Sequence, residues 1–333
     1  MQSKHSIEKQ TAHYVDCFTT VSEITNNECR ELLDKPADVV LMNGFEDDFV
    51  PKGATFTGKR KRARSTMLRV ANCLLGEDLG DDTLIIGTSG RYEFKNKGID
   101  VFLESLNRLN RDKDLKKKVL AFVNVPSWVG DPREDLQKRL KSKDKFTEPL
   151  QCPFITHWLH NMTHDQVLDM LKYLGMGNRP EDKVKVIFVP CYQDGHDGIL
   201  NKHYYDLILG EDLSVYPSYY EPWGYTPLES VAFRVPTITT DLAGFGLWVN
   251  SLKNQHGIND GVEVLHRSDY NYSEVADGIK DTVALFSTKT EAEIKEIRKR
   301  AGQVAEQALW KHFIQYYYEA YDIALRNAMK RQL

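Results

Sequence analysis

The chain has 333 residues, a length that suits two domains or one large one, and its 41% hydrophobic and 28% charged residues are ordinary for a soluble globular protein. Its net charge of −4 gives no electrostatic argument for nucleic-acid binding, and no apolar run approaches the ~20 residues that span a bilayer. The five cysteines contain no CxxC pair, which argues against a disulfide framework or a zinc site and favours a cytoplasmic protein.

The first segment of the chain has the pattern of a fragment of an α/β domain. Its expected elements are, in order, a helix at 4–16, a strand at 17–21, a helix at 22–33 with Ser22 as its N-cap, and a strand at 37–42. Asn43-Gly44 closes the second strand. The strands that would precede this pair are missing, so we expect the segment to be the tail of a domain whose main body lies outside the chain.

A basic run opens the next segment. Within residues 52–76 the chain places five cations in six positions, which are Lys59, Arg60, Lys61, Arg62 and Arg64. Such a run is usually the solvated face of a helix. The helical spacing of the apolar residues that follow favours this interpretation over contact with a polyanion.

Strands alternate with helices from Thr83 to His266. The expected strands are 83–88, 118–125, 184–190, 213–217, 235–240 and 261–266, with helices at 99–109, 163–174, 204–209 and from 226 onward. This alternation predicts a doubly wound parallel sheet, interrupted by a polar excursion at 126–154. Three closing helices, at 273–286, 291–307 and 309–329, follow. No GxGxxG stands after the first strand, so the dinucleotide fingerprint is absent.

Two patterns resemble metal sites without the features that such sites need. Asp112-Lys-Asp114 matches a DxD motif but lies at a helix end among lysines. His157, His160 and His164 lie close in sequence, but no carboxylate or cysteine accompanies them at a known metal spacing. We therefore expect no bound metal.

The densest candidate site is residues 216–246, YPSYYEPWGYTPLESVAFRVPTITTDLAGFG. Glu221 and Glu229 stand there with seven residues between them, around an aromatic and glycine turn. Thr226 suits an N-cap, Pro227 the first helical position and Glu229 the third, which predicts a capping box. Free backbone N–H groups and the helix dipole would make this helix start an anion site. The alternative, that Glu229 only closes the box and that the aromatic rings only pack, stays open.

Two cations lie in the connection after the first strand of the sheet. Arg91 and Lys97 belong to the segment GRYEFKNKG. In a parallel sheet this connection lies at the carboxyl edge, where ligands bind, so the pair can neutralise a diphosphate. The alternative is that Arg91 or Lys97 pairs with Glu93 at the surface.

Several blocks, in this order, resemble glycogen synthase of the animal and fungal type, a retaining glucosyltransferase with the GT-B fold of two Rossmann-like domains. They are FTTVSEIT, NGF, GRYEFKNKG with DVFLE, and YPSYYEPWGYTPLES with PTITTDLAGFG, which has the family's E-x7-E spacing. The resemblance spans essentially the whole chain but only the carboxyl-terminal part of the family's length. It implies a remnant of the amino-terminal, acceptor-side domain at 1–50, a Rossmann-like donor domain at 51–270 and C-terminal helices at 271–333.

The resemblance also implies an activity. Members transfer glucose from UDP-glucose to the 4-hydroxyl of a growing α-1,4-glucan, with retention and without a metal or cofactor. The implied partners are UDP-glucose and the glucan acceptor, with no nucleic acid and no membrane, while homo-oligomerisation stays open. Two alternatives also stay open: another retaining GT-B nucleotide-sugar transferase, or a nucleotide-sugar-binding fragment without turnover.

Roles for individual residues follow from the same resemblance. Catalysis is assigned to Glu221, beside the donor glucose, and to Arg91 and Lys97, on the diphosphate. Donor binding is assigned to Tyr204, Trp223, Gly224, Tyr225, Thr226, Pro227, Leu228 and Glu229. Tyr204 is expected to stack on uracil and Glu229 to bind the ribose hydroxyls. The backbone N–H groups around residues 225–228 would complete the phosphate cradle.

Overall fold

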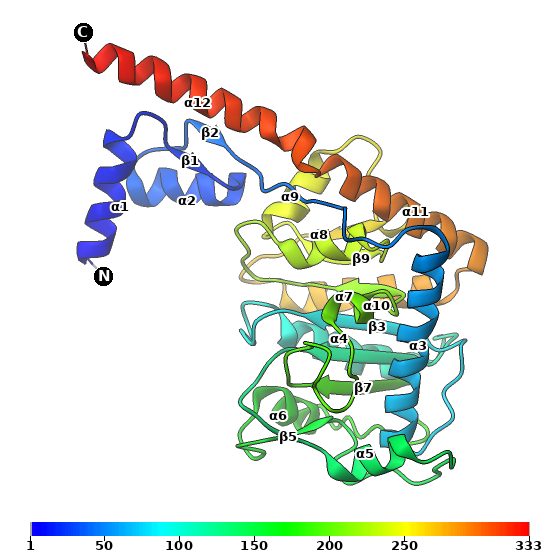
Figure 1. Cartoon of the computed structure of the whole chain (residues 1–333). Coiled ribbons are helices and arrows are strands. Elements are labelled where there is room, and N and C mark those ends of the chain that lie inside the picture. Colours follow the sequence, from blue (N-terminus) through cyan, green and yellow to red (C-terminus); the bar gives the residue numbers. More distant parts are fainter. Residues whose placement is uncertain (1, 333) are drawn as a thin grey trace.

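A six-stranded parallel sheet forms the centre of the computed structural model, which describes residues 2–332 (Figure 1). The strand order is β10–β9–β8–β3–β4–β7, and every neighbouring pair is parallel. The strands are β3 (Leu84–Ser89), β4 (Val119–Asn124), β7 (Val184–Val189), β8 (Leu213–Val215), β9 (Thr237–Thr240) and β10 (Val262–Leu265). The doubly wound sheet predicted from the alternating pattern is confirmed.

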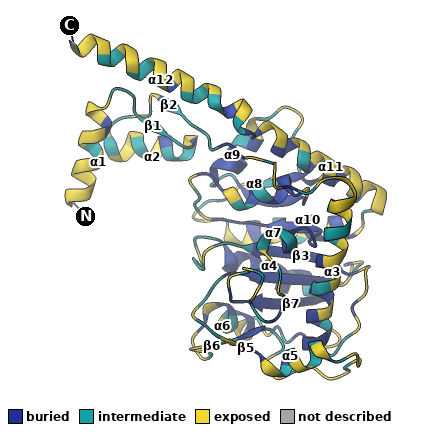
Figure 2. Ribbon diagram, viewed as in Figure 1, coloured by how far each residue is buried: buried dark blue, intermediate teal, exposed yellow. Residues whose placement is uncertain are grey.

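Helices cover both faces of this sheet, which is why its strands are continuous apolar runs. Ile86 belongs to the core on the face covered by α4 (Ile99–Asn110), α6 (Gln166–Tyr173) and α10 (Tyr272–Ser287). Its neighbour Ile85 belongs to the core on the opposite face, beneath α3 (Gly53–Leu75), α5 (Glu134–Lys141) and α7 (Tyr204–Ile208). The buried layer between them is continuous in Figure 2.

A third core cluster lies at the β10 side of the sheet. It joins four helices: α8 (Tyr225–Ala232), α9 (Gly244–Ser251), α11 (Glu291–Gln307) and α12 (Trp310–Gln332). A short 3-10 helix, Ile258–Asp260, precedes β10. None of the helices described within residues 2–332 has the length and apolar content that crossing a membrane requires.

The amino-terminal segment forms a small lobe that stands apart from the sheet (Figure 1). It contains α1 (Gln2–Tyr14), β1 (Thr19–Thr20), α2 (Glu23–Leu33) and β2 (Val39–Val40), and its two strands pair in parallel. Ser22 caps α2 as expected, in a capping box completed by Thr25. The far end of α12 reaches this lobe, where Asn327 Nδ2 donates to the Asp16 carbonyl oxygen at 2.7 Å.

The polar excursion after β4 is more ordered than its composition suggests. It holds α5 and an antiparallel pair, β5 (Val129–Pro132) with β6 (His157–Leu159), which the sequence did not predict. Arg133 organises it from a fully buried position, donating to the carbonyl oxygens of Gln151 (2.7 Å) and Cys152 (2.8 Å). Its guanidinium lies 4.5 Å from the ring centroid of Trp158.

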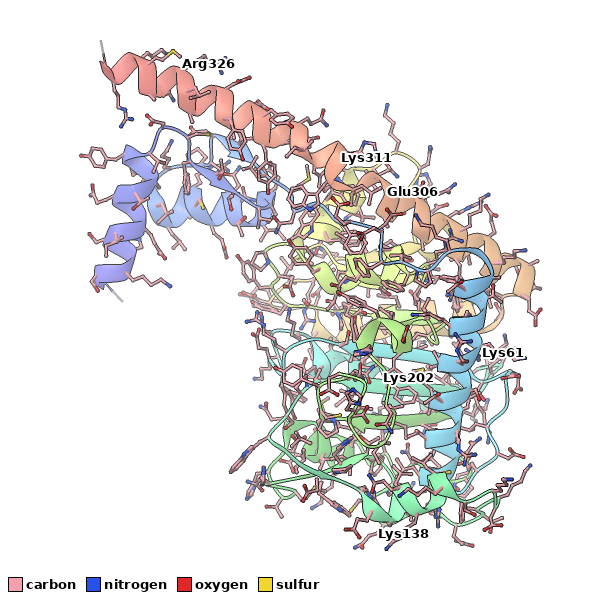
Figure 3. The ribbon with its side chains drawn as sticks, in the orientation of Figure 1. Lys61, Lys138, Lys202, Glu306, Lys311 and Arg326 are labelled. Carbon is pink, nitrogen blue, oxygen red and sulfur yellow. The ribbon has the colours of Figure 1, made fainter. Side chains whose placement is uncertain are left out.

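The interpretation of the basic run as a solvated helix face is wrong for part of it. Arg60 Nη2 and Arg64 Nη1 each lie 2.6 Å from a carboxylate oxygen of Asp212, at the start of β8. Spacing of four residues puts both arginines on the face of α3 that packs on the sheet, while Lys61 projects outward (Figure 3). Burial alone would raise the pKa of Asp212, but Arg64 and Arg60 outweigh it and hold that pKa below its usual value.

Candidate functional site

A cavity of about 350 Å³ opens where β3, β4 and β7 end. Its walls are the end of β3, the end of β4, the loop after β7 and the amino-terminal turns of α7 and α8. This is the carboxyl edge of the parallel sheet, where ligands bind in doubly wound folds. A larger cavity, of about 940 Å³, lies at the opposite edge around Arg60, Arg64 and Asp212, away from the predicted site residues.

Tyr204 lines the first cavity from the start of α7. Its hydroxyl lies 2.9 Å from Ser89 Oγ, and Ser89 Oγ in turn donates to the Tyr216 hydroxyl at 3.5 Å. Burial raises the pKa of Tyr204 well above its usual value, so the phenol stays neutral. These contacts fix the ring at the cavity wall.

Lys97 and Glu221 form an ion pair beside the cavity. The pair joins two segments that also touch through the backbone, since the Tyr219 N–H donates to the Asn96 carbonyl oxygen at 2.8 Å. Gly98 permits this approach, because its φ is +67° and a Cβ there would overlap the Pro217 carbonyl. The structure therefore brings one predicted cation and one predicted catalytic carboxylate into direct contact.

Arg91 lines the cavity as well, but its side chain is 76% exposed. Its Nη1 lies 3.1 Å from Glu93 Oε1, so the surface pairing considered for the two cations is observed for Arg91. Lys97 has a different partner, Glu221.

The predicted capping box at α8 is wrong. The helix begins at Tyr225, with Gly224 as N-cap at φ 108° and no side-chain cap, because glycine adopts this left-handed turn without strain. Thr226 therefore lies inside the first turn and lines the cavity. Glu229 accepts a hydrogen bond from the Tyr205 hydroxyl at 2.8 Å instead of closing a box. Burial raises the pKa of Glu229, and the Tyr205 hydroxyl opposes that rise.

The remaining predicted donor-site residues differ in what they present to the cavity. Trp223 is buried in an aromatic cluster, with its ring centroid 6.3 Å from that of Phe245 and 6.0 Å from that of Phe313. Pro227 and Leu228 are also buried in the core. The side chains of Trp223 and Leu228 thus support the turn, while Thr226 is the residue of this segment that lines the cavity.

Two amide side chains that no sequence motif had singled out, Asn124 and Gln193, also line the cavity. Asn124 is the last residue of β4, and Gln193 follows β7. The rule that selected Arg91, a polar residue after a strand at the carboxyl edge, applies equally to both. Neither belongs to a block of the family resemblance, which is why they were passed over.

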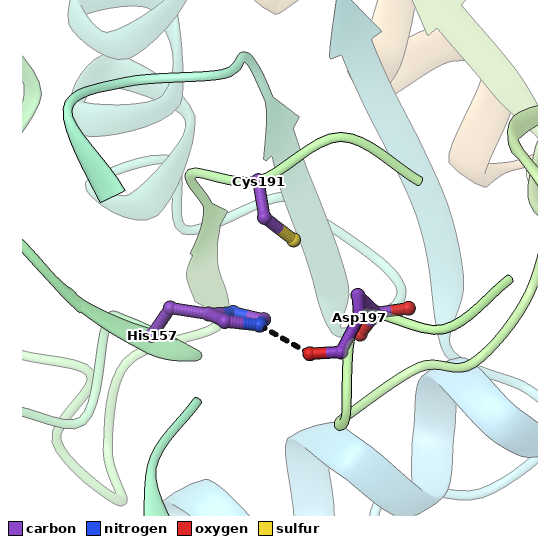
Figure 4. Close-up of side chains that lie close together, drawn as sticks. All are labelled: His157, Cys191 and Asp197. Carbon is purple, nitrogen blue, oxygen red and sulfur yellow. Dashed lines mark hydrogen bonds between the residues drawn. The ribbon is translucent and has the colours of Figure 1, made fainter. Parts of the chain in front are cut away.

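His157, Cys191 and Asp197 form a cluster near the cavity, with potential ligand atoms within 4.8 Å of one another (Figure 4). Their hydrogen bonds point to a structural task. His157 places Nε2 2.7 Å from the Asp197 carbonyl oxygen and Nδ1 2.9 Å from Thr156 Oγ1. The Asp197 carboxylate accepts three backbone N–H groups, those of residues 199, 200 and 201. Burial raises the pKa of Cys191 to about 12, so its sulfur stays protonated.

The histidines that lie close in sequence, which we did not expect to bind a metal, have separate surroundings in the structure. His160 packs against Trp128, with ring centroids 5.0 Å apart, while His157 belongs to the cluster just described. That the protein works without a metal stays a prediction.

The sequence as a whole also matches known proteins. The family model for glycogen synthase matches residues 1–131 and 131–333. The chain belongs to the glycogen synthase family. Glycogen (starch) synthase of Neurospora crassa is 28% identical, over 98% of this chain and 54% of that protein. Isoform 2 of Saccharomyces cerevisiae is 29% identical, over 99% of the chain and 56% of that protein. This member of the glycogen synthase family thus spans about half the length of the curated relatives it matches.

Solved structures agree at the level of the fold. The catalytic domain of Starch Synthase IV from Arabidopsis thaliana, bound to ADP and acarbose, resembles this chain with a TM-score of 0.58 and 12% sequence identity. The likeness covers 96% of this chain and 57% of that one. The glycogen synthase family member described here has the α/β fold of the GT-B glycosyltransferases.

Proposed function

We propose that this chain is the donor-binding half of a glycogen synthase, which transfers glucose from UDP-glucose to the 4-hydroxyl of an α-1,4-glucan with retention. One observation carries the proposal: the cavity walled by Tyr204 lies at the same sheet edge as Arg91, the Lys97–Glu221 pair and the start of α8. An aromatic wall, cations and a helix N-terminus are together the chemistry of a nucleoside diphosphate site.

In this proposal the uridine lies in the cavity against Tyr204, and Glu229 binds the ribose hydroxyls. The diphosphate lies between Arg91, Lys97 and the backbone N–H groups at the start of α8. Pro227 has no N–H, so this backbone contribution comes from its neighbours. Together these donors and cations stabilise the charge that develops on the leaving UDP, which makes a metal or cofactor unnecessary.

Glu221 contacts the donor glucose and stabilises positive charge at its anomeric carbon. The bond from that carbon to the phosphate oxygen breaks while the bond to the acceptor 4-oxygen forms on the same face. The acceptor hydroxyl proton passes to the departing phosphate oxygen. The reaction therefore needs no second protein nucleophile.

The division of the chain in this proposal has three parts. Residues 1–50 belong to the acceptor-side domain, residues 51–270 bind the donor, and residues 271–333 are C-terminal helices. In the last part, α10 packs against α4 and α11 against α8, which supports the donor domain. Transfer to a glucan also requires the rest of the acceptor-side domain, in a cytoplasmic protein whose homo-oligomerisation stays open.

Titration calorimetry of UDP with the 333-residue chain tests the donor site. Arg91→Ala and Lys97→Ala should each weaken binding by about 1.5–3 kcal/mol, the scale of hydrogen bonds to charged groups. Lys311→Ala is the matched control, since Lys311 is exposed on α12 (Figure 3) and should leave the affinity unchanged. Absence of UDP binding to the folded chain would overturn the proposal.

A second candidate, a nucleotide-sugar-binding module without turnover, is favoured by one observation: the chain spans about half the length of its relatives. Both candidates predict UDP binding. Glucosyl transfer from UDP-glucose to glycogen by the chain alone would exclude the second.

A further inference from the structure

We infer that Asn124 and Gln193 form an amide pair that recognises the hydrogen-bonding edge of the donor's nucleobase. This inference rests on the proposed function, because it assigns a task to side chains within the proposed UDP site. It concerns residues outside the blocks that carry the family resemblance.

The two amides are in direct contact inside the cavity. Gln193 Nε2 donates to Asn124 Oδ1 at 2.8 Å, and both residues line the cavity wall. Asn124 is only 8% exposed, at the end of β4. Two polar side chains, one from the end of β4 and one from the loop after the adjacent strand β7, thus meet at the wall of the cavity.

The pair is also tied to the stacking residue. The Tyr204 N–H donates to the carbonyl oxygen of Gln193 at 3.1 Å. The backbone of Gln193 and the start of α7 therefore move together. A base that stacks on the Tyr204 ring would lie within reach of amides held in fixed relation to that ring.

One contact leaves hydrogen-bonding capacity unused. An amide offers a carbonyl oxygen and an NH2 group. Among residues 2–332, the bond from Gln193 Nε2 is the one side-chain hydrogen bond that either amide makes, so Gln193 Oε1 and Asn124 Nδ2 are free to bind a ligand. A ligand that brings both a donor and an acceptor can satisfy these two atoms at once.

The hydrogen-bonding edge of uracil supplies both a donor and an acceptor. Its N3–H is a donor flanked by carbonyl acceptors, so Gln193 Oε1 can accept N3–H while Asn124 Nδ2 donates to a neighbouring carbonyl. Stacking on Tyr204 fixes the plane of the base, and the amide pair fixes its rotation within that plane. Rotation of the base sets where the ribose and diphosphate leave the cavity, toward Arg91 and α8.

Calorimetry with two ligands tests the inference: UDP, and the 5′-diphosphate of 3-methyluridine, which lacks the N3–H donor. The unaltered chain should bind UDP roughly 3- to 10-fold more tightly than the methylated ligand, the range of one neutral hydrogen bond. Gln193→Leu should remove that preference, by weakening UDP binding and leaving the methylated ligand unchanged. Asn124→Leu should also lower UDP affinity, and it serves as the second variant if Gln193→Leu does not fold.

Gln303→Leu is the matched control, because Gln303 is exposed on α11 and the change of side chain is the same. It should keep the preference for UDP. If Gln193→Leu folds and retains the full preference, or if Asn124→Leu folds and retains the full UDP affinity, the inference is overturned while the proposed UDP site stands. If the unaltered chain binds neither ligand, the proposed function fails first.

Discussion

Lys97 is neutralised before any donor arrives. Its ammonium pairs with Glu221, and the side chains are only 13% and 18% exposed. In such a shielded place the interaction between charges is stronger than at the surface. In the function proposed above, a diphosphate that binds Lys97 competes with Glu221 for the ammonium, and the carboxylate it displaces can then contact the donor sugar.

Glu221→Gln should raise the affinity for UDP by roughly 3- to 10-fold, because it releases Lys97 and removes a negative charge near the phosphates. Glucosyl transfer should fall in the same variant. Calorimetry measures the affinity. In a Lys97→Met background the gain should vanish, so an equal gain there, or weaker UDP binding by Glu221→Gln, would contradict the exchange of partners.

The sequence could predict the positions of both cations and, as one alternative, the pairing of Arg91 with Glu93, but not the partner of Lys97. Arg91 and Lys97 follow a strand that an apolar run makes evident, and strand ends of one orientation share an edge. The partner of Lys97 is 124 positions away, and the contact depends on the backbone approach at Gly98. Neither fact is contained in local spacing.

At the scale of elements, the start of α8 shows how local rules compete. Thr226 and Gly224 both suit an N-cap, and the residues between give no reason to choose. The fold decides, because Tyr205 on α7 binds Glu229 and the left-handed Gly224 turns the chain earlier. The sheet strands were predictable because burial on both faces makes them apolar. The β5–β6 pair was not, since Arg133 and its carbonyl partners hold a polar segment in place.

Glu211 lies between β3 and β8 in the middle of the molecule. Its Oε2 accepts a hydrogen bond from Ser214 at 2.6 Å, and a Cβ at Gly87 would overlap its carboxylate. Burial raises the pKa of Glu211 to about 8, with a smaller upward effect of Asp212 and an opposing one of Ser214. The packing of two central strands thus includes a carboxyl group that carries a proton at neutral pH.

Glu211 should make the chain less stable as pH rises. The unfolded carboxyl has the ordinary value of 4.5, so between pH 4.5 and about 8 the folded state binds more protons. Stability from this group falls across that window by up to ~1.4 kcal/mol per pH unit. The Glu211→Gln variant has no carboxyl at this position, so it should not lose stability in this way as the pH rises. Urea unfolding of both proteins at several pH values should show the unaltered chain losing stability relative to the variant.

Glu306→Gln is the control for that comparison, because Glu306 is exposed on α11 (Figure 3). Its curve should run parallel to that of the unaltered chain. Parallel curves for Glu211→Gln as well would show that Glu211 does not titrate in this window.

At the scale of the whole molecule, the chain passes between lobe and sheet twice, before α3 and through α12. The two passages meet at Phe45, whose N–H donates to the Ala308 carbonyl at 3.0 Å and whose carbonyl accepts the Trp310 N–H at 3.2 Å. Gly44 lies against the Trp310 ring, where a Cβ would overlap the indole. Asn43-Gly44 was predicted as the end of a strand. The contact of Gly44 and Phe45 with residues 308–310 could not be predicted, because Trp310 is far along the chain.

Gly44→Ala should destabilise the protein by about 1–3 kcal/mol, the usual cost of overpacking. Thermal unfolding measures it. Gly58→Ala, in the second turn of α3 where the nearest atom is a flexible arginine tip at 3.4 Å, should instead raise stability by about 0.5–1 kcal/mol, because alanine favours a helix. Equal effects of the two substitutions would mean that Trp310 does not pack closely on Gly44.

This junction has a mechanical consequence. α12 has 23 residues, so it is a stiff rod of roughly 35 Å at 1.5 Å per residue, clamped near one end by Phe45 and fastened to the lobe at the other through Asn327. If α12 tilts, it therefore pivots near Trp310. A tilt of roughly 10° at this pivot would carry its tip through roughly 6 Å. Any such tilt would have to break the direct contacts between the lobe and the sheet domain, among them the hydrogen bond that the Tyr220 hydroxyl donates to Glu28 of α2.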